Sequence, residues 1–344
     1  MKKSDPAYPP LLAVGTFVVD YQKVVDHYPD ERSATRVSRE MVSNGGAPLN
    51  TLINLAKLRV PFPLFAAAKV GKDLDGKFIV DCCTEHKIDT SQLQPVEGES
   101  TGYTDVYTVE KTGKHTCFHF CGIGETFSRA DVKLRAVKPK ILLLGSLGAL
   151  GKMDNHNPEY GRSGAAQLLR DAKKQGITTV VEIAPVDQQA KLDDFTEALS
   201  QADYLIINDR VAESILNQEL YSENQFDADL AKDACEQLLK TGLHKAVILQ
   251  CGTAAVYLDT EGNFYHQTGY FLPWSQRVGS AGVDHAFVAG FLEGLYLDKA
   301  VETSLQQGLA VSTTCRRDLT PSGGLAPLDE CMAFCEQLDI KAAS

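Results

Sequence analysis

The feature that most constrains this chain is an alternation of short apolar runs with segments of helical periodicity through most of its 344 residues. Runs of strand length lie at Leu11–Asp20, Phe62–Val70, Ile141–Gly145, Thr178–Ile183, Tyr204–Asn208 and Ala246–Gln250. Segments with helical spacing lie at Ala47–Leu58, Asp73–His86, Gly164–Gln175, Phe226–Lys240, Gly282–Leu297 and Val301–Thr314. Alternation with short connections predicts an α/β fold, doubly wound, with a mainly parallel sheet.

Two stretches, Thr16–Arg39 and Thr101–Phe120, interrupt the alternation because they are rich in β-forming residues and contain no helical segment. Within the second stretch, Thr104–Val109 and His115–Phe120 predict the arms of a hairpin around Lys111–Lys114. Such strands form either a small sheet that covers a ligand or a surface hairpin without a role.

Charge and cysteine content bear on the class of protein. The 34 basic and 45 acidic residues give a net charge of -11, which disfavours nucleic acid and anionic membranes as partners. No run approaches the roughly 18 apolar residues that span a membrane. The apolar Leu11–Val19 after Met1–Pro6 predicts a core strand and not a signal peptide, so we expect a cytoplasmic protein. The nine cysteines are expected to be free thiols, and no metal-ligating cluster is predicted.

Two features near the N-terminus are candidates for ligand binding. In the segment Asn44–Asn50, Gly45 and Gly46 permit close approach of a ligand to the backbone, and Pro48 suits a first helical turn. Asp20 ends the first predicted strand, and ligands of open α/β sheets bind beyond the carboxyl ends of strands. Its carboxylate can accept hydrogen bonds from a polyol. The alternatives are a tight turn that only starts a helix and a surface aspartate that only ends a strand.

Further candidates lie in the C-terminal half. A small-residue loop runs into an apolar helix at Val278–Phe291, where free amides and the helix dipole stabilise negative charge. A titratable side chain in that first turn can take a proton from an attacking hydroxyl; close helix packing is the alternative. Val70–Gly76 opens a helix at Asp73, for which a structural role is expected. Glu182 ends a strand, where it faces either magnesium or a substrate or has no role in a site.

Asp20, the Gly45-Gly46 pair with Asn50, Val70–Asp73 and Gly282–Gly290 occur in an order and at a spacing that resemble the ribokinase (PfkB) family of carbohydrate kinases, from roughly Leu11 to Leu338. The resemblance implies a single ribokinase-like domain over residues 1–344, with a small β lid from about 16–39 and 101–120. It also implies ATP and Mg²⁺ as cofactors, transfer of the γ-phosphoryl group to a sugar or sugar-acid hydroxyl, and a homodimer formed through the lid.

Residue by residue, the resemblance places the predicted substrate contacts at Asp20, Gly45, Gly46 and Asn50. The helix start at Gly282 would supply the anion hole. The predicted nucleotide-binding residues are Asn208, Gln250 and Gly252. The variant Gly45–Pro48 is more similar to the fructokinase and ketodeoxygluconate kinase branch than to the nucleoside kinases.

Three positions depart from the family pattern. The family's Gly-Ala-Gly-Asp, whose aspartate is the catalytic base, reads Gly282-Val283-Asp284-His285, so His285 stands at the base position and Asp284 replaces a glycine of the anion hole. Repulsion of a phosphate by Asp284 would cost on the order of a few kcal/mol, and Asp284 is also able to cap the helix, which would occupy the amides meant for the ligand. The magnesium-organising Asn-x-x-Glu reads Asn208–Val211 without its glutamate, and the nucleotide loop Thr-x-Gly-x-x-Gly keeps only Gly252.

These departures leave two main interpretations open. In the first, the chain is an ATP-dependent kinase whose catalytic residues are Asp284 or His285 as base and Gly282 in the anion hole; a neutral imidazole can serve as base near neutral pH. In the second, it is a catalytically weak or inactive relative that binds a sugar or sugar phosphate as a sensor, regulator or structural partner. A different reaction on the same fold is a third alternative.

Overall fold

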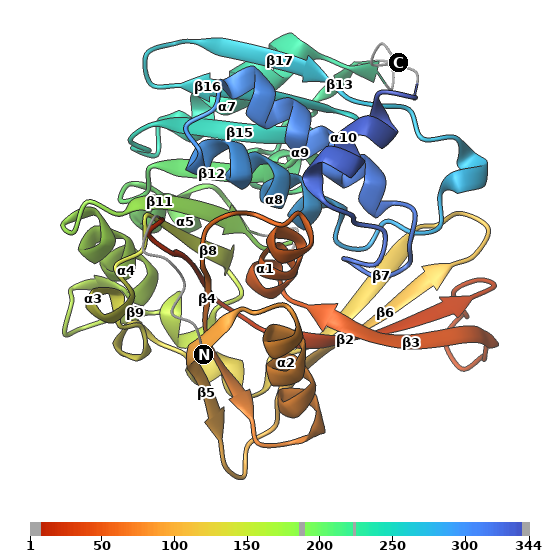
Figure 1. Ribbon diagram of the computed structural model, residues 1–344, viewed down its shortest axis with the longest axis horizontal. Helices are drawn as coiled ribbons and strands as arrows, with labels where there is room; N and C mark the ends of the chain where they lie inside the picture. The colour runs from red at the N-terminus through yellow and green to blue at the C-terminus, as the bar shows by residue number, and fades with distance from the viewer. Residues whose placement is uncertain (1–7, 186–189, 223–224, 339–344) are drawn as a thin grey trace.

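The computed structural model describes residues 8–185, 190–222 and 225–338; the segment Met1–Pro6 and the C-terminal end of the expected 1–344 domain lie outside these ranges. At its centre is a nine-stranded sheet (Figure 1). Its spatial order is β17 (Phe264–Thr268), β16 (Ala254–Asp259), β15 (Ala246–Cys251), β12 (Tyr204–Asn208), β11 (Thr178–Ile183), β8 (Ile141–Leu147), β1 (Leu11–Val14), β4 (Leu64–Gly71) and β5 (Asp89–Val96). The strands from β15 to β5 pair in parallel, and β16 and β17 are antiparallel, which confirms the predicted mainly parallel sheet.

Helices cover both faces of this sheet. One face carries α1 (Ala47–Lys57), α2 (Leu74–Glu85), α8 (Val283–Tyr296), α9 (Val301–Cys315) and α10 (Leu328–Cys335). The other carries α3 (Leu134–Val137), α4 (Gly164–Lys173), α5 (Asp193–Leu199), α6 (Asp209–Leu216) and α7 (Ala228–Leu239). Short 3-10 turns lie at Gly122–Thr126, Arg129–Asp131, Gly151–Met153 and Trp274–Gln276, and two-residue strands pair as β9 (His156–Asn157) with β10 (Arg162–Ser163) and β13 (Tyr221–Ser222) with β14 (Gln225–Phe226).

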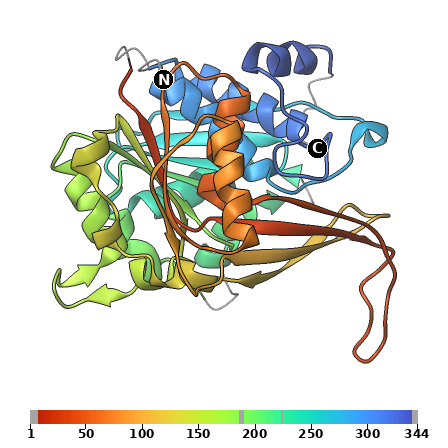
Figure 2. The ribbon, with the colours of Figure 1, turned by 60° about the horizontal axis from the view of Figure 1, so that its bottom comes forward.

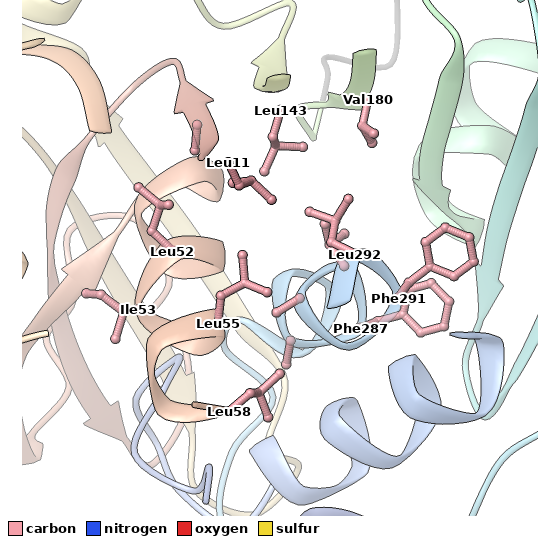
Figure 3. Close-up of a cluster of buried hydrophobic side chains, with 14 of the residues drawn as sticks. Leu11, Leu52, Ile53, Leu55, Leu58, Leu143, Val180, Phe287, Phe291 and Leu292 are labelled. Atoms are coloured by element: carbon pink, nitrogen blue, oxygen red, sulfur yellow. The ribbon is translucent and has the colours of Figure 1, made fainter. Parts of the chain in front are cut away.

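The core consists of two apolar layers separated by the sheet. Along β8, Ile141 and Leu143 belong to the layer beneath α1 and α8, whereas Leu142 and Leu144 belong to the opposite layer. Figure 3 shows side chains of α1 and α8 packed over those of the central strands. Because both faces are buried, the strands read as continuous apolar runs and not as alternating ones. Each fully buried aliphatic side chain contributes roughly 1.5–3 kcal/mol.

A second sheet projects from the main body (Figures 1 and 2). Its order is β3 (Val37–Gly45), β2 (Val18–Val25), β6 (Gly102–Val109) and β7 (His115–Phe120). The predicted hairpin is confirmed, since β6 and β7 pair antiparallel, while β2 pairs in parallel with β6 and antiparallel with β3. Strand β3 continues to Gly45, beyond the predicted end of the first irregular stretch at Arg39.

The expectation of a single strand over Leu11–Asp20 is wrong. The chain leaves the main sheet after Val14 and enters the four-stranded sheet at Val18. Gly15 permits this crossing, because its φ is 146° and a Cβ there would lie 2.5 Å from the carbonyl oxygen of Gly145. Asp20 therefore lies within β2 and does not end a strand of the main sheet.

The other predicted elements agree with the structure apart from their ends. The helix expected at Phe226–Lys240 begins only at Ala228, because the Asp227 side chain accepts hydrogen bonds from the amides of Asp229 and Leu230. Phe226 instead pairs with Tyr221 in a short strand.

Two further findings concern the described part of the chain. All nine cysteines lie in it as unpaired thiols, and Cys331 and Cys335 share one buried face of α10. None of the helices in the described ranges is both long and apolar enough to cross a membrane.

The start of α1 generates a first prediction. Gly46 has φ 84°, and a Cβ there would lie 2.2 Å from the carbonyl oxygen of Thr16, whereas Gly98 has φ 74° and nothing within 4 Å. We expect Gly46→Ala to lower the free energy of unfolding by more than about 2 kcal/mol, and Gly98→Ala to cost only the roughly 1–2 kcal/mol of a left-handed backbone. Urea unfolding measures both values; equal losses would contradict the close-contact argument.

Candidate functional site

A cavity of about 440 Å³ lies between the carboxyl edge of the main sheet, the starts of α1 and α8, and one face of the four-stranded sheet. It brings together most of the residues that the sequence singled out. Lining it are Asp20, Gly46, Asn50, Asn208, Gln250, Gly282, Asp284 and His285, together with Glu182. Gly45 and Gly252 are not among its lining residues, and their contact with a ligand stays a prediction.

Three adjacent strands each carry a polar residue that lines this cavity, at the last or next-to-last position of the strand. Glu182 lies two residues after Val180 on β11, Asn208 two after Ile206 on β12, and Gln250 two after Ile248 on β15; these three apolar residues belong to one layer of the core. Parallel pairing places Glu182 opposite Ile206 and Asn208 opposite Gln250. Side chains two residues apart share a face, so the three polar groups form a row at the carboxyl edge.

Glu182 is the acid of this row. It is 6% exposed, and its Oε2 has no hydrogen-bond partner among the described residues. Burial raises the pKa of Glu182 to about 8, and the negative charge of Asp284 adds to the effect. A buried, unpartnered carboxyl oxygen facing a cavity is a donor set that fits a cation or a hydroxyl group.

Asp20 contributes a second buried acid from the four-stranded sheet. Burial raises its pKa to about 7, although a hydrogen bond from Thr104 lowers it in part. The carboxylate fits there because Gly45, opposite Val18 on β3, has no side chain: a Cβ at Gly45 would lie 2.0 Å from Asp20 Oδ1. The glycine therefore makes room for the acid, whatever else it contacts.

A chain of side-chain amides orients His285. Asn44 Nδ2 donates to Asn50 Oδ1 at 2.7 Å, so the Nδ2 of Asn50 is the atom that lies 3.3 Å from His285 Nδ1. An amide nitrogen donates, so the network assigns an unprotonated Nδ1 to the histidine. Burial lowers the pKa of His285, while the nearby charge of Asp284 opposes this shift.

Asp284 lies in the first turn of α8 and points toward the sheet edge. Gly282 is the N-cap and no side chain caps this helix, so the alternative in which Asp284 caps it is wrong. Instead, Asp284 Oδ2 accepts a hydrogen bond from Asn208 Nδ2 at 2.7 Å. Asn208 is itself fixed, because its Oδ1 accepts from the amide of Val211 at 2.9 Å at the start of α6.

Residues of β6 and β7 that sequence reasoning missed complete the cavity. His115, Cys117 and His119 line it together with Thr104, whose hydroxyl lies 3.0 Å from His119 Nδ1. Their spacing of two along the strand places the three β7 side chains on one face. That alternation was readable in the sequence, but only once β7 was known to lie against the cavity.

The tip of the β6–β7 hairpin touches the loop before α8. The hydroxyl of Ser280 donates to the carbonyl oxygen of Gly113 at 3.2 Å and lies 3.1 Å from His115 Nδ1. The four-stranded sheet is thus joined to the helix start that carries Asp284 and His285.

Comparison with known proteins gives a family match over most of the chain. The model described as pfkB family carbohydrate kinase matches residues 10–322. The ribokinase of Haemophilus influenzae is 22% identical over 302 residues, which cover 88% of this chain and 90% of that protein. A 5-dehydro-2-deoxygluconokinase of Clostridium beijerinckii is 23% identical over 323 residues, covering 90% and 89%.

Solved structures show the same fold. The ribokinase of Arabidopsis thaliana, complexed with ribose and ATP, aligns with a TM-score of 0.77 at 19% identity and covers 96% of this chain and 99% of its own. The ribokinase of Giardia lamblia aligns with a TM-score of 0.78 at 19% identity, covering 95% and 100%. The ribokinase-like fold predicted from the sequence is therefore confirmed.

The buried acid of β2 gives a pH-dependent prediction. The folded-state pKa of Asp20, about 7, exceeds the ordinary value of 3.8, so the folded protein retains a proton that the unfolded chain has released. Stability is thus lost as pH rises from about 4 to about 7, by on the order of a few kcal/mol. We expect Asp20→Asn to raise the free energy of unfolding near pH 8 and to change it little near pH 4.

Denaturant unfolding at a series of pH values measures this difference. The exposed Asp26, which directly follows β2, supplies the control, since Asp26→Asn should leave the pH profile unchanged. A stabilisation by Asp20→Asn that is the same at both pH values would contradict the prediction.

Proposed function

The chain belongs to the pfkB family of carbohydrate kinases, and we propose that it transfers the γ-phosphoryl group of ATP to a hydroxyl group of a sugar or sugar acid, with His285 as the base. The observation that carries the proposal is the position of His285, with Nδ1 3.3 Å from the amide of Asn50 in a cavity also lined by Asp20. A base must lie within hydrogen-bond reach of the proton it takes.

The chemistry of the acceptor side follows from this geometry. Asp20 and Asn50 bind the sugar hydroxyls, and the acceptor hydroxyl takes the place of the Asn50 amide at His285 Nδ1. As the acceptor oxygen forms its bond to the γ-phosphorus and the bond to the β–γ bridging oxygen breaks, the hydroxyl proton passes to Nδ1. The lowered pKa of His285 keeps the free imidazole neutral, and the charge of Asp284 stabilises the imidazolium that forms.

The phosphates of ATP are proposed to bind at the start of α8. The first amides of a helix lack partners within it, so those following Gly282 are available to the γ-phosphate. Asn208 and Gln250 line the cavity nearby. Mg²⁺ would neutralise charge on the phosphates, as in other phosphoryl transfers. The Arabidopsis ribokinase holds ATP on this fold, which supports the assignment of ATP to this chain.

The four-stranded sheet is proposed to act as the lid of a single domain formed by residues 1–344. Its inner face lines the cavity through β2, β6 and β7, so it would exclude water from the transferring phosphoryl group. The comparisons do not identify the sugar substrate, because the relatives named above act on different sugars.

The charge of Asp284 favours a second candidate, a catalytically weak or inactive sugar-binding relative that acts as a sensor or regulator. A carboxylate in the first turn of α8 repels a phosphate at the point where the helix amides would hold it. In this alternative the sugar half of the cavity binds its ligand, and Asp284 keeps nucleotide out.

Replacing the proposed base tests the first candidate. We expect His285→Gln to lower kcat at least about 100-fold with little change in KM for the sugar, because glutamine cannot take the proton. The measurement is ADP release with a panel of sugars and sugar acids. The exposed His244 provides the control, and His244→Gln should leave both constants unchanged.

The second candidate predicts different results. Calorimetry with Mg-ATP would then give no heat at millimolar nucleotide. The double change Asp284→Gly with His285→Asp would create sugar-dependent turnover that the parent lacks. Either result would count against His285 as a working base.

The outer face of the four-stranded sheet supports the proposed homodimer. Val42 of β3 and Phe118 and Phe120 of β7 are 50%, 62% and 46% exposed. The Tyr103 ring of β6 lies tilted against Phe120, and the Tyr107 ring packs edge-to-face against Phe118. Clustered exposed aromatic side chains are typical of protein interfaces.

A charge on this face should therefore break the dimer. We expect Phe118→Glu to convert a dimer to a monomer in sedimentation equilibrium at micromolar concentration. Tyr8 is 43% exposed and packs against Tyr296 of α8 on the main body, so Tyr8→Glu should leave the mass unchanged. A monomeric parent protein would refute the dimer.

A further inference from the structure

The cavity contains one acidic residue, Glu182, that has no role in the proposed reaction. Glu182 lies almost fully buried at the end of β11, and its Oε2 has no partner in the described ranges. Buried polar atoms are nearly always hydrogen-bonded, so such an oxygen in the wall of a cavity indicates a missing ligand. Neither the Asn50–His285 network nor the first amides of α8 use it.

A second acid of the cavity, Asp284, is held in place by a residue of the sheet edge. Asn208 is anchored through its Oδ1 to the amide of Val211, and its Nδ2 holds Asp284 Oδ2. Asn208 lies two residues after Ile206, the register partner of Glu182, and therefore on the same face of the sheet. Glu182 and Asp284 therefore line the same cavity from different elements, and the charge of Asp284 acts on the carboxyl group of Glu182.

We propose that Glu182 and Asp284 together bind the divalent cation that accompanies the nucleotide, a role that rests on the proposed kinase function. Mg²⁺ is commonly held by one or two carboxylates, with waters and substrate phosphates as its other ligands. Within the described ranges no group of three or more histidine, cysteine, aspartate or glutamate side chains is arranged to hold a metal. A site of two carboxylates, with phosphate oxygens as the remaining ligands, needs no third such side chain.

The site explains two departures of the sequence together. Val211 stands where the family has a magnesium-organising glutamate, and Asp284 stands where it has a glycine. A cation between Asp284 and the phosphates converts the repulsion between them into attraction on both sides. The acid lost from α6 is thus replaced from the facing turn of α8.

Binding of Mn²⁺ to the full chain tests the site without nucleotide or turnover. Free Mn²⁺ is measured by electron paramagnetic resonance during titration. We expect one bound Mn²⁺ per chain, weakened at least about tenfold by Glu182→Gln and likewise by Asp284→Asn. Asp209 directly follows Asn208 but bonds to Tyr221 and does not line the cavity, so Asp209→Asn should change the affinity by less than about twofold.

Thermal unfolding with and without Mn²⁺ distinguishes a loss of metal binding from misfolding of a variant. Bound Mn²⁺ should raise the Tm of the parent protein and of Asp209→Asn, but not that of the two cavity variants, whose metal-free Tm should show that they are folded. No binding by the parent at millimolar Mn²⁺, or equal affinities in all four proteins, would overturn the proposal.

These measurements test the proposed metal site and the proposed kinase function separately. If Mn²⁺ binds as expected and no sugar is phosphorylated, the result supports the proposed metal site and contradicts the proposed kinase function. If sugar phosphorylation is observed but the cavity variants bind Mn²⁺ as the parent does, the result supports the proposed kinase function and contradicts the proposed metal site.

Discussion

Parallel pairing of β11, β12 and β15 is the constraint on which the pocket depends. Each strand is apolar on both faces until its last residues, because helices cover both sides of the sheet. Near the carboxyl ends of these strands the apolar pattern gives way to the polar residues Glu182, Asn208 and Gln250, and the register pairs Glu182 with Ile206 and Asn208 with Gln250. The two-residue repeat of a strand thus converts three separate sequence positions into one polar edge.

The distribution of charge around that edge distinguishes this pocket from a simple sugar cleft. Asp20 and Glu182 are buried acids on opposite walls, and both have raised pKa values. Asp284 lies between the halves and acts on both: its charge supports a proton on His285 and raises the pKa of Glu182. This one carboxylate in the first turn of α8 therefore acts electrostatically on both His285 and Glu182.

The sequence predicts most elements of the fold because their signals are local. Helical spacing and apolar runs locate α1, α8, β11 and β12 to within a residue or so. The break after Val14 escapes prediction, since it depends on a close approach of Gly15 to Gly145, which is distant in sequence. The bond between Asp284 and Asn208 and the inner face of β7 escape for the same reason. Motif spacing finds Asp20, Asn50 and His285, but not the residues that orient them.

The contact between Ser280 and the β6–β7 hairpin links two parts of the pocket that belong to different sheets and helices. Its hydroxyl bridges Gly113 and His115 on one side, and its backbone leads directly into α8 on the other. Opening the hairpin removes this support from the loop, and a shift of the loop removes it from the hairpin. A movement of the hairpin and a movement of the loop before α8 are consequently coupled through Ser280.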